Sequence, residues 1–407
     1  MLAACPRTPT PVALETIDAG ACVCAAVTTA PKLPAKPVRV NEPTSELHDV
    51  HPLAVCDSKG QDPLAAAQKF ADDEKWEPAL SCAAQASALM PDEPLAHAER
   101  GRALIALERL DEAKLAYARA LALDPQSLDG LLGAAHLYAV VLPSSREVDE
   151  LGVIYAERGF SLASLETEGA LVDRDMALEF GRISAMALND VGRNAEAIER
   201  ADFVLSRVKD DPEASFERAV ALFERCQFDD AKAAFQRLVT DKTRSAHAHY
   251  HLALLLEREG KQAEADKHFA KAQKFSPEQF WTPVILPMAE FEAELQKLID
   301  ALEPEVKRDL ANVPIKAEDI PQLNDLTTGE PPLSPTILGL FRGPPLQEQC
   351  VPADGDPCRS VALYRKNLGR AVKSREELIQ QMRVTLLHEI GHLRGEDDGE
   401  LAARGLE

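Results

Sequence analysis

The sequence predicts a mainly α-helical protein, in which an α-solenoid of repeats is followed by a small α+β domain. Alanine-rich amphipathic sequence recurs with a 34-residue period from about residue 60. The period stops after Pro277, where short apolar runs typical of strands appear and 12 of the 28 prolines follow, between residues 283 and 407. We therefore expect three parts, residues 1–60, 61–280 and 281–407.

The composition excludes some classes of partner. The 407 residues include 45 Lys and Arg against 67 Asp and Glu, a formal net charge of −22. Nucleic acid is not an expected partner, because its binding requires clustered positive charge. The longest stretch without a formal charge, Gly130 to Ser145, has 16 residues. A membrane-spanning helix needs roughly 18–20 apolar residues, so no transmembrane helix is expected.

Residues 1–60 form the first part, which we expect to be a proline-rich disordered tether. At its start, Leu2-Ala3-Ala4-Cys5 resembles the lipobox of bacterial lipoproteins. The resemblance implies a lipid anchor at Cys5 and a place in the cell envelope, as a periplasmic or outer-membrane lipoprotein. The charged and apolar stretches of a signal peptide do not precede the motif. Either the start of the chain is assigned too late, or the match is chance and the protein is cytoplasmic.

The cysteines bear on the compartment as well. Cys350 and Cys358 flank a short Asp/Gly/Pro turn and could form a disulfide, which would indicate an oxidising compartment. Ordinary thiols are the alternative. Cys22 and Cys24 lack a second pair at zinc-finger spacing, and Cys82 is expected in a helical core.

Small residues define the repeat in residues 61–280. Ala79 and Ala113 are 34 residues apart, and so are Ala197, Ala231 and Ala265. Small side chains at such positions let two helices approach closely. The interval of 84 residues between Ala113 and Ala197 leaves room for one irregular repeat with an insertion, at roughly 128–190.

This pattern resembles the tetratricopeptide repeat, a helix–turn–helix unit. Gly101, Ala113, Tyr117, Ala120 and Pro125 stand at the signature positions of that family, although its first-helix tryptophan is absent. The resemblance implies a curved solenoid that binds a protein or peptide partner.

Three alternating histidines lie inside the repeats. His247 and His251 are four residues apart on an expected helix and could chelate a metal ion. Neither a carboxylate nor a cysteine stands in the same turn, so we expect a packing or solvent-facing role for His247, His249 and His251.

Residues 281–407 read as a mixture of helices and strands. An apolar stripe predicts a helix over 291–302, and a helix from about 375 to Gly395 begins at Ser374, whose capping box includes Glu377. The expected strands cover residues 312–315, 337–341 and 361–364.

The second of these helices carries His388-Glu389-Ile390-Gly391-His392, an H-E-x-x-H motif. Residues four apart share one helix face, so both imidazoles can bind one Zn²⁺, and the Glu between them is the general base in metalloproteases. A third ligand must come from the acidic cluster Glu396, Asp397, Asp398 and Glu400. We favour Asp398, because Gly395 lets the chain turn back; a solvated helix exit is the alternative for this cluster.

The whole segment resembles the minimal bacterial zincin-like metallopeptidases, with a His-Glu-x-x-His-x-x-Gly-x-x-Asp site. The resemblance implies that His388, His392 and Asp398 are the metal positions and that Glu389 is the catalytic glutamate. Residues Gln347 to Pro357 look like an insertion, and Leu393-Arg394 departs from the family, where His and an aromatic residue are common.

These observations predict a zinc metallopeptidase whose repeats bind the protein substrate or another protein. Tyr364, Arg342 and Arg365 are candidates for an oxyanion donor. One alternative is a scaffold or adaptor whose zincin-like domain is inactive or structural. Another is a zinc hydrolase that acts on non-peptide amide bonds.

Overall fold

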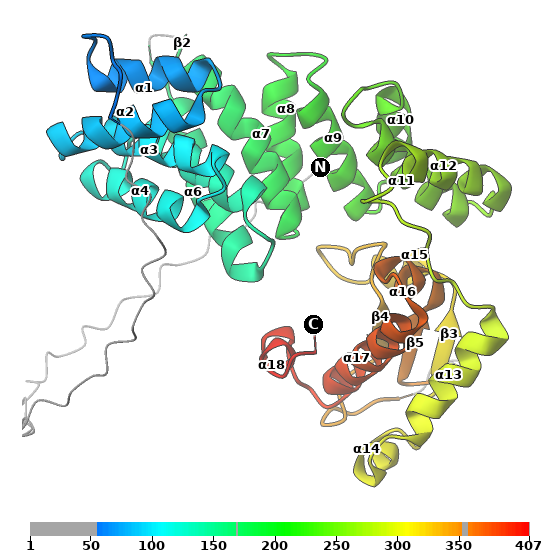
Figure 1. Ribbon diagram of the computed structural model, residues 1–407. Coiled ribbons are helices and arrows are strands. Elements are labelled where there is room, and N and C mark those ends of the chain that lie inside the picture. The colour runs from blue at the N-terminus through cyan, green and yellow to red at the C-terminus, as the bar shows by residue number, and fades with distance from the viewer. Residues whose placement is uncertain (1–54, 168–169, 352–356, 407) are drawn as a thin grey trace, which may run out of the picture. The chain divides into compact units, whose positions relative to one another are not determined.

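The computed structural model describes residues 55–167, 170–351 and 357–406. Their helices and strands belong to one compact unit, Leu53–Glu407. The order of these elements confirms the predicted fold class, helical repeats followed by a small α+β domain (Figure 1). None of the described helices combines the length and the apolar character that a membrane span requires. The candidate lipidation site Cys5 and the pair Cys22 and Cys24 lie outside the described residues.

The repeat region consists of helices that pack against their neighbours in chain order (Figure 1). The helices up to the irregular segment are α1 (Pro63–Asp72), α2 (Trp76–Leu89), α3 (Pro94–Ala106) and α4 (Leu110–Leu123). The irregular segment comprises α5 (Leu128–His136), the π-helix η1 (Leu137–Val141), α6 (Arg146–Ala163), the antiparallel strands β1 (Glu166–Thr167) and β2 (Ala170–Leu171), and α7 (Arg174–Asp190). The remaining helices are α8 (Asn194–Leu205), α9 (Pro212–Glu224), α10 (Phe228–Leu238), α11 (Ser245–Arg258) and α12 (Gln262–Phe275).

The turns between the helices repeat with the period that the sequence shows. Residues with positive φ stand at Glu74 and Glu108, and again at Gly192, Cys226 and Gly260. Within each series the spacing is 34 residues. A left-handed residue after a helix lets the next N–H groups bond back to the last carbonyls of that helix. The same turn therefore reverses the chain in each of these repeats.

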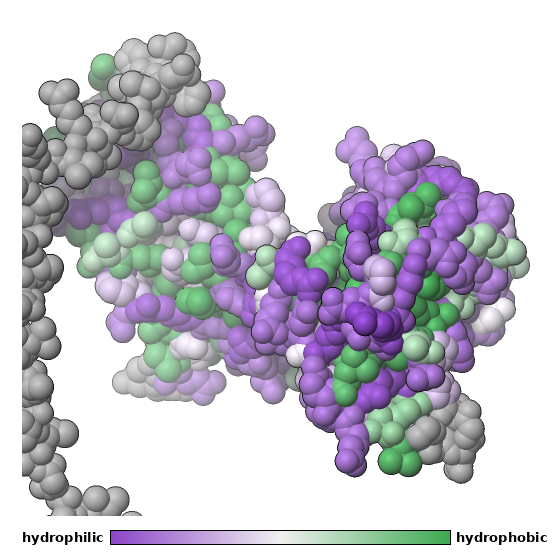
Figure 2. All heavy atoms as spheres, turned by 90° about the horizontal axis from the view of Figure 1, so that it is seen from below, coloured by the Kyte–Doolittle hydropathy of each residue, from purple (hydrophilic) through white to green (hydrophobic). Residues whose placement is uncertain are grey.

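Small residues allow the helices of the repeats to pack closely. Ala197, Ala231 and Ala265 are each 0% exposed. A Cβ on Gly101 would lie 2.7 Å from the ring of Tyr117, so glycine leaves the room that this aromatic side chain fills. On the face seen in Figure 2, hydrophilic residues cover most of the visible surface and hydrophobic residues show between them.

The C-terminal domain consists of two long helices, a three-stranded sheet and short helices around them (Figure 1). Its elements are α13 (Met288–Asp300), α14 (Pro304–Asp309), β3 (Ile315–Glu318), α15 (Leu323–Leu326), β4 (Gly339–Arg342), β5 (Ser360–Tyr364), α16 (Arg365–Ala371), α17 (Arg375–Leu393) and α18 (Asp398–Ala403). The strand order is β3-β5-β4, with β3 parallel and β4 antiparallel to the central β5. Side chains of α13 and α17, such as Phe291 and Leu386, form the core with Val361 and Leu363 of β5.

The first strand begins later than the sequence predicts. Residues 312–315 were the expected strand, whereas the paired residues of β3 are Ile315–Glu318. Pro314 has no N–H to donate, and only its carbonyl joins the ladder, by accepting from the N–H of Val361. Pairing through both backbone groups therefore starts at the residue after the proline.

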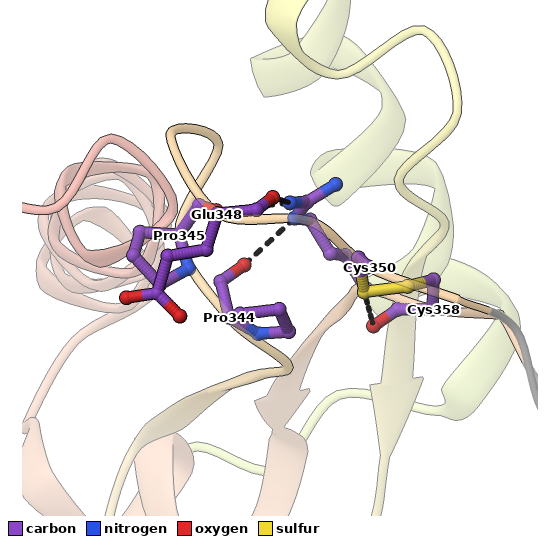
Figure 3. Close-up of a disulfide and its surroundings, with 6 residues drawn as sticks. Pro344, Pro345, Glu348, Cys350 and Cys358 are labelled. Carbon is purple, nitrogen blue, oxygen red and sulfur yellow. Dashed lines mark hydrogen bonds between the residues drawn. A yellow bond between two sulfur atoms is a disulfide. The ribbon is translucent and has the colours of Figure 1, made fainter.

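Two disulfides occur in the described residues. Cys56 is bonded to Cys82 of α2, with their Cα atoms 4.6 Å apart. Cys82 is 0% exposed, as expected for a core residue, but the bond to Cys56 was not expected, because residue 56 lies in the predicted tether. Cys350 and Cys358 are joined as well. Beside this disulfide, the guanidinium of Arg359 donates hydrogen bonds to the carbonyl oxygens of Pro344 and Glu348 (Figure 3).

Candidate metal centre

Helix α17 positions the two histidines and the glutamate of the H-E-x-x-H motif. Ser374 begins the helix by accepting a hydrogen bond from the N–H of Glu377. The carboxylate of Glu377 reaches back to the N–H of Lys373, at 2.8 Å, instead of to Ser374. The helix ends at Leu393, and Gly395 follows with a φ of 86°, a conformation that suits glycine.

The structure brings His388, His392 and Asp398 together. The two Nε2 atoms are 3.0 Å apart, and Oδ1 of Asp398 lies 3.5 Å from the first and 3.2 Å from the second. Asp398 is the first residue of α18, whose start is fixed by a capping box between Asp397 and Glu400. One possible ligand atom from each of these three residues lies within 4.8 Å of the other two, and among the described residues the structure shows this one cluster of three possible metal ligands.

Backbone carbonyls orient both imidazole rings. Nδ1 of His388 lies 2.6 Å from the carbonyl oxygen of Leu406, and Nδ1 of His392 lies 3.0 Å from that of Glu396. A carbonyl oxygen only accepts, so each Nδ1 carries a proton and donates it. In a neutral imidazole this leaves a lone pair on Nε2, and both lone pairs face the carboxylate of Asp398.

This donor set fits a Zn²⁺ ion. Two imidazole lone pairs and a carboxylate repel one another unless a proton or a cation lies between them. Ligand atoms at about 2.0–2.1 Å from a tetrahedral zinc are roughly 3.3 Å apart, close to the separations of 3.0, 3.2 and 3.5 Å in this group. Three protein ligands leave one position open, as catalytic zinc sites do.

Glu389 lies beside these side chains and is only 6% exposed. Burial raises the pKa of Glu389, whereas the imidazoles of His388 and His392 and the backbone N–H of Phe341 oppose that rise. Strand β4 approaches it closely, since a Cβ on Gly339 would lie 2.8 Å from its Oε1. Glycine at this position therefore makes room for the carboxylate.

A cavity of about 380 Å³ opens over these groups. His388, Glu389, His392 and Asp398 contribute its polar groups, together with Gln381 and Thr385. Most of the remaining lining is apolar, namely Leu333, Ile337, Leu338, Leu340, Phe341, Val384 and Leu406. The arrangement combines a desolvated carboxylate, a cation-binding group and an apolar wall.

The candidate oxyanion donors do not line this cavity in the described part of the chain. Arg342 donates to the carboxylates of Glu318 and Asp325. Arg365 donates to Asp319, and Tyr364 is 0% exposed. The structure therefore does not place these three candidates at the cavity over the metal centre.

The other acidic residues of the C-terminal cluster have partners of their own. Glu396 pairs with Arg404, and Glu400 belongs to the capping box of α18. In the repeats, the ring of His251 stacks on that of Phe235, with 4.5 Å between the ring centroids. Its Nδ1 lies within hydrogen-bond distance, 2.9 Å, of the carbonyl oxygen of His247. A packing or solvent-facing role was expected for His247, His249 and His251, and the stacked ring of His251 has the packing role.

Sequence reasoning missed the groups that support the site. These are the carbonyls of Leu406 and Glu396 and the glycine at 339. A backbone carbonyl leaves no signal in a sequence, since every residue has one. A glycine between two apolar residues was the one available sign of a close approach.

Family models match segments of the repeats and the C-terminal domain. Residues 310–406 match the model of the zincin-like metallopeptidases. Residues 94–127 and 225–279 match two models of the tetratricopeptide repeat. The chain thus carries tetratricopeptide repeats and a C-terminal zincin-like metallopeptidase domain, a family that implies zinc binding in general.

Several solved structures are similar to part of this chain. One is YrrB, described as a tetratricopeptide repeat protein with an unusual peptide-binding site, at 17% identity and a TM-score of 0.37 over 48% of this chain and 93% of that one. Another is PilF of Pseudomonas aeruginosa, at 14% identity and 0.43 over 57% and 96%. A repeat protein from Parabacteroides merdae has 17% identity and 0.41 over 61% and 95%. No curated protein matches the chain.

Proposed function

We propose that the protein is a zinc-dependent metallopeptidase that hydrolyses peptide bonds. His388, His392 and Asp398 hold the metal ion, and Glu389 is the catalytic base. The convergence of two imidazole nitrogens and one carboxylate beside a buried glutamate carries this proposal. A bound Zn²⁺ supplies Lewis-acid polarisation of the scissile carbonyl and lowers the pKa of water toward about 7.

The protein's own residues supply the proton transfer and the position of the substrate. Glu389 takes the proton of the attacking water and delivers it to the leaving amine. Its burial removes solvent that would compete for the carboxylate. Strand β4 is an edge of its sheet, and its Leu340 and Phe341 line the cavity. A free strand edge can hold an extended peptide by backbone hydrogen bonds.

Removal of the metal provides a test of this function. The purified protein is incubated with an unfolded polypeptide, and new chain ends are identified by mass spectrometry. We expect internal peptide bonds to be cleaved, cleavage to stop after treatment with a chelator, and added Zn²⁺ to restore it. Cleavage that persists at full rate in the metal-free protein would contradict the proposal.

The main alternative is a repeat scaffold or adaptor with an inactive or structural zincin-like domain. It predicts no new chain ends under any metal condition. A structural zinc site is usually closed by four protein ligands, whereas Asp398 is 81% exposed and the group contains three. A structural site also has no use for a buried glutamate beside its ligands. A second alternative is a zinc hydrolase that acts on non-peptide amide bonds. Hydrolysis of a small non-peptide amide, without hydrolysis of peptides, would favour it.

The repeats are proposed to bind a protein or peptide, either the substrate itself or a partner that delivers it. Their presence in the same chain supports this role, since helical repeats of this family form binding surfaces for other chains.

We also propose that the protein lies in the cell envelope with a lipid on Cys5. The disulfides Cys56–Cys82 and Cys350–Cys358 support an oxidising compartment. The test is the cell fraction that contains the protein, with and without Cys5→Ser. Release of the variant from the membrane fraction is expected. A cytoplasmic protein with all four thiols reduced would contradict both the lipid and the compartment.

A further inference from the structure

A second cavity lies within the repeats, far along the chain from the metal centre. Its volume is about 600 Å³, and residues of α2, α3, α4, α5 and α7 line it. The lining combines apolar and aromatic side chains with several charged ones. These residues are Trp76, Ala98, Glu99, Arg102, Ile105, Ala106, Tyr117, Asp129, Leu132, Gly133, His136, Glu179 and Ile183.

Two glycines fix the position of Tyr117 in this cavity. A Cβ on Gly133 would lie 2.0 Å from the ring of Tyr117, and one on Gly101 would lie 2.7 Å from it. The ring therefore fits between α3 and α5 and has little freedom to move. Burial raises the pKa of Tyr117, and the negative charge of Glu99 raises it further.

Glu99 carries a buried oxygen without a hydrogen bond. Only 10% of its side chain is exposed. Its Oε1 accepts from Nε2 of Gln68 at 3.3 Å, but its Oε2 has no hydrogen-bond partner. A guanidinium nitrogen of Arg102 lies 3.8 Å from Oε2, beyond hydrogen-bond distance. A buried carboxylate oxygen in this state is costly, and a donor that entered the cavity would remove that cost.

The charge of the lining favours a cation as the donor. The lining contains three carboxylates, those of Glu99, Asp129 and Glu179, and one guanidinium, that of Arg102. The carboxylate of Glu179 is already paired with Arg182, outside the lining, at 2.8 Å. Arg102 also bonds to Asp72, outside the lining, at 3.3 Å. Burial lowers the pKa of His136, so this imidazole is neutral near pH 7. The cavity therefore has an excess of negative charge.

We propose that this cavity binds an extended segment of another polypeptide, one that carries an arginine or lysine next to apolar residues. The cationic head faces Glu99 and Asp129. Its aliphatic stem and the neighbouring apolar side chain pack against Tyr117, Ile105 and Leu132. Arginine suits the site better than lysine, because its planar head can donate two parallel hydrogen bonds to a carboxylate.

This inference rests on the protein-binding role proposed for the repeats and names the chemistry of their partner. It is independent of peptide hydrolysis, since none of the lining residues belongs to the metal centre. Loss of one activity would therefore leave the other measurable.

The test compares two fluorescent peptides that differ in one residue. One carries arginine between leucines, and the other carries citrulline, a neutral analogue of the same shape. Binding to the full-length protein is followed by fluorescence anisotropy, and mass spectrometry checks that the peptides stay intact. We expect the arginine peptide to bind at least about tenfold more tightly to the wild type, as expected for a hydrogen bond between charged groups. Glu99→Gln should abolish most of this preference.

Two further variants complete the test. Glu147→Gln removes the same charge from an exposed position of α6 outside the cavity, and it should keep the preference. Asp129→Asn should weaken it, and this variant answers the question if Glu99→Gln does not fold. Equal binding of the arginine and citrulline peptides to the wild type would overturn the proposal. So would a preference that both cavity variants retain.

Discussion

Replacement of Glu389 by glutamine is expected to lower the rate of peptide hydrolysis by about 10²–10⁴-fold, the usual contribution of a general base. Glutamine has nearly the size of glutamate, so it should fit beside Gly339, where an added Cβ would lie 2.8 Å from Oε1 of Glu389. It cannot take a proton from water. Glu389 is not one of the three grouped metal ligands, so the variant should keep its zinc. The measurement is the hydrolysis rate together with the zinc content by elemental analysis.

The control for this experiment is Glu376→Gln. It makes the same change in the first turn of the same helix, at an exposed residue, and it should leave both rate and zinc content unchanged. Undiminished hydrolysis in Glu389→Gln would refute the role of this residue. A variant that loses its zinc would show instead that Glu389 contributes to metal binding.

Replacement of His392 by alanine is expected to abolish stoichiometric zinc binding and, with it, hydrolysis. The change removes one of the two imidazoles that converge on Asp398 and leaves a pair of ligand atoms, Nε2 of His388 and Oδ1 of Asp398. Loss of several kcal/mol of charge stabilisation corresponds to a fall in rate of roughly 10³-fold. Zinc per chain after dialysis and the rate of cleavage are the two measurements.

His97→Ala serves as the matched control, because His97 lies in α3 of the repeats, outside the cavity over the metal centre. It should retain one zinc per chain and the full rate. One tightly bound zinc in His392→Ala would mean that the metal is held elsewhere, and the assignment of the site would then be wrong.

The helical repeats could be predicted because their period is expressed in side chains. Ala231 and Ala265 mark the same buried position in successive units, and both are 0% exposed. The left-handed turns follow the same period, but the sequence does not reveal them, because glutamate occupies that position at 74 and 108 and cysteine at 226. Only Gly192 and Gly260 carry the residue that such a backbone favours.

Short-range geometry explains why the metal centre could be predicted in part. His388 and His392 are four residues apart on one helix, so their proximity follows from helix geometry alone. The position of Asp398 depended on the turn at Gly395, which glycine made plausible. The bond from Cys56 to Cys82 and the pairing of β3 with β5 join residues that are 26 and 46 positions apart in the sequence, and periodicity does not report such contacts.

The most direct test of the whole account is a titration of the metal-free protein with Zn²⁺, in which bound zinc and peptide cleavage are measured in the same samples. The account predicts that the cleavage rate rises in proportion to bound zinc and reaches its plateau at one zinc per chain. Full occupancy without cleavage of any peptide, or cleavage that does not depend on zinc, would contradict it.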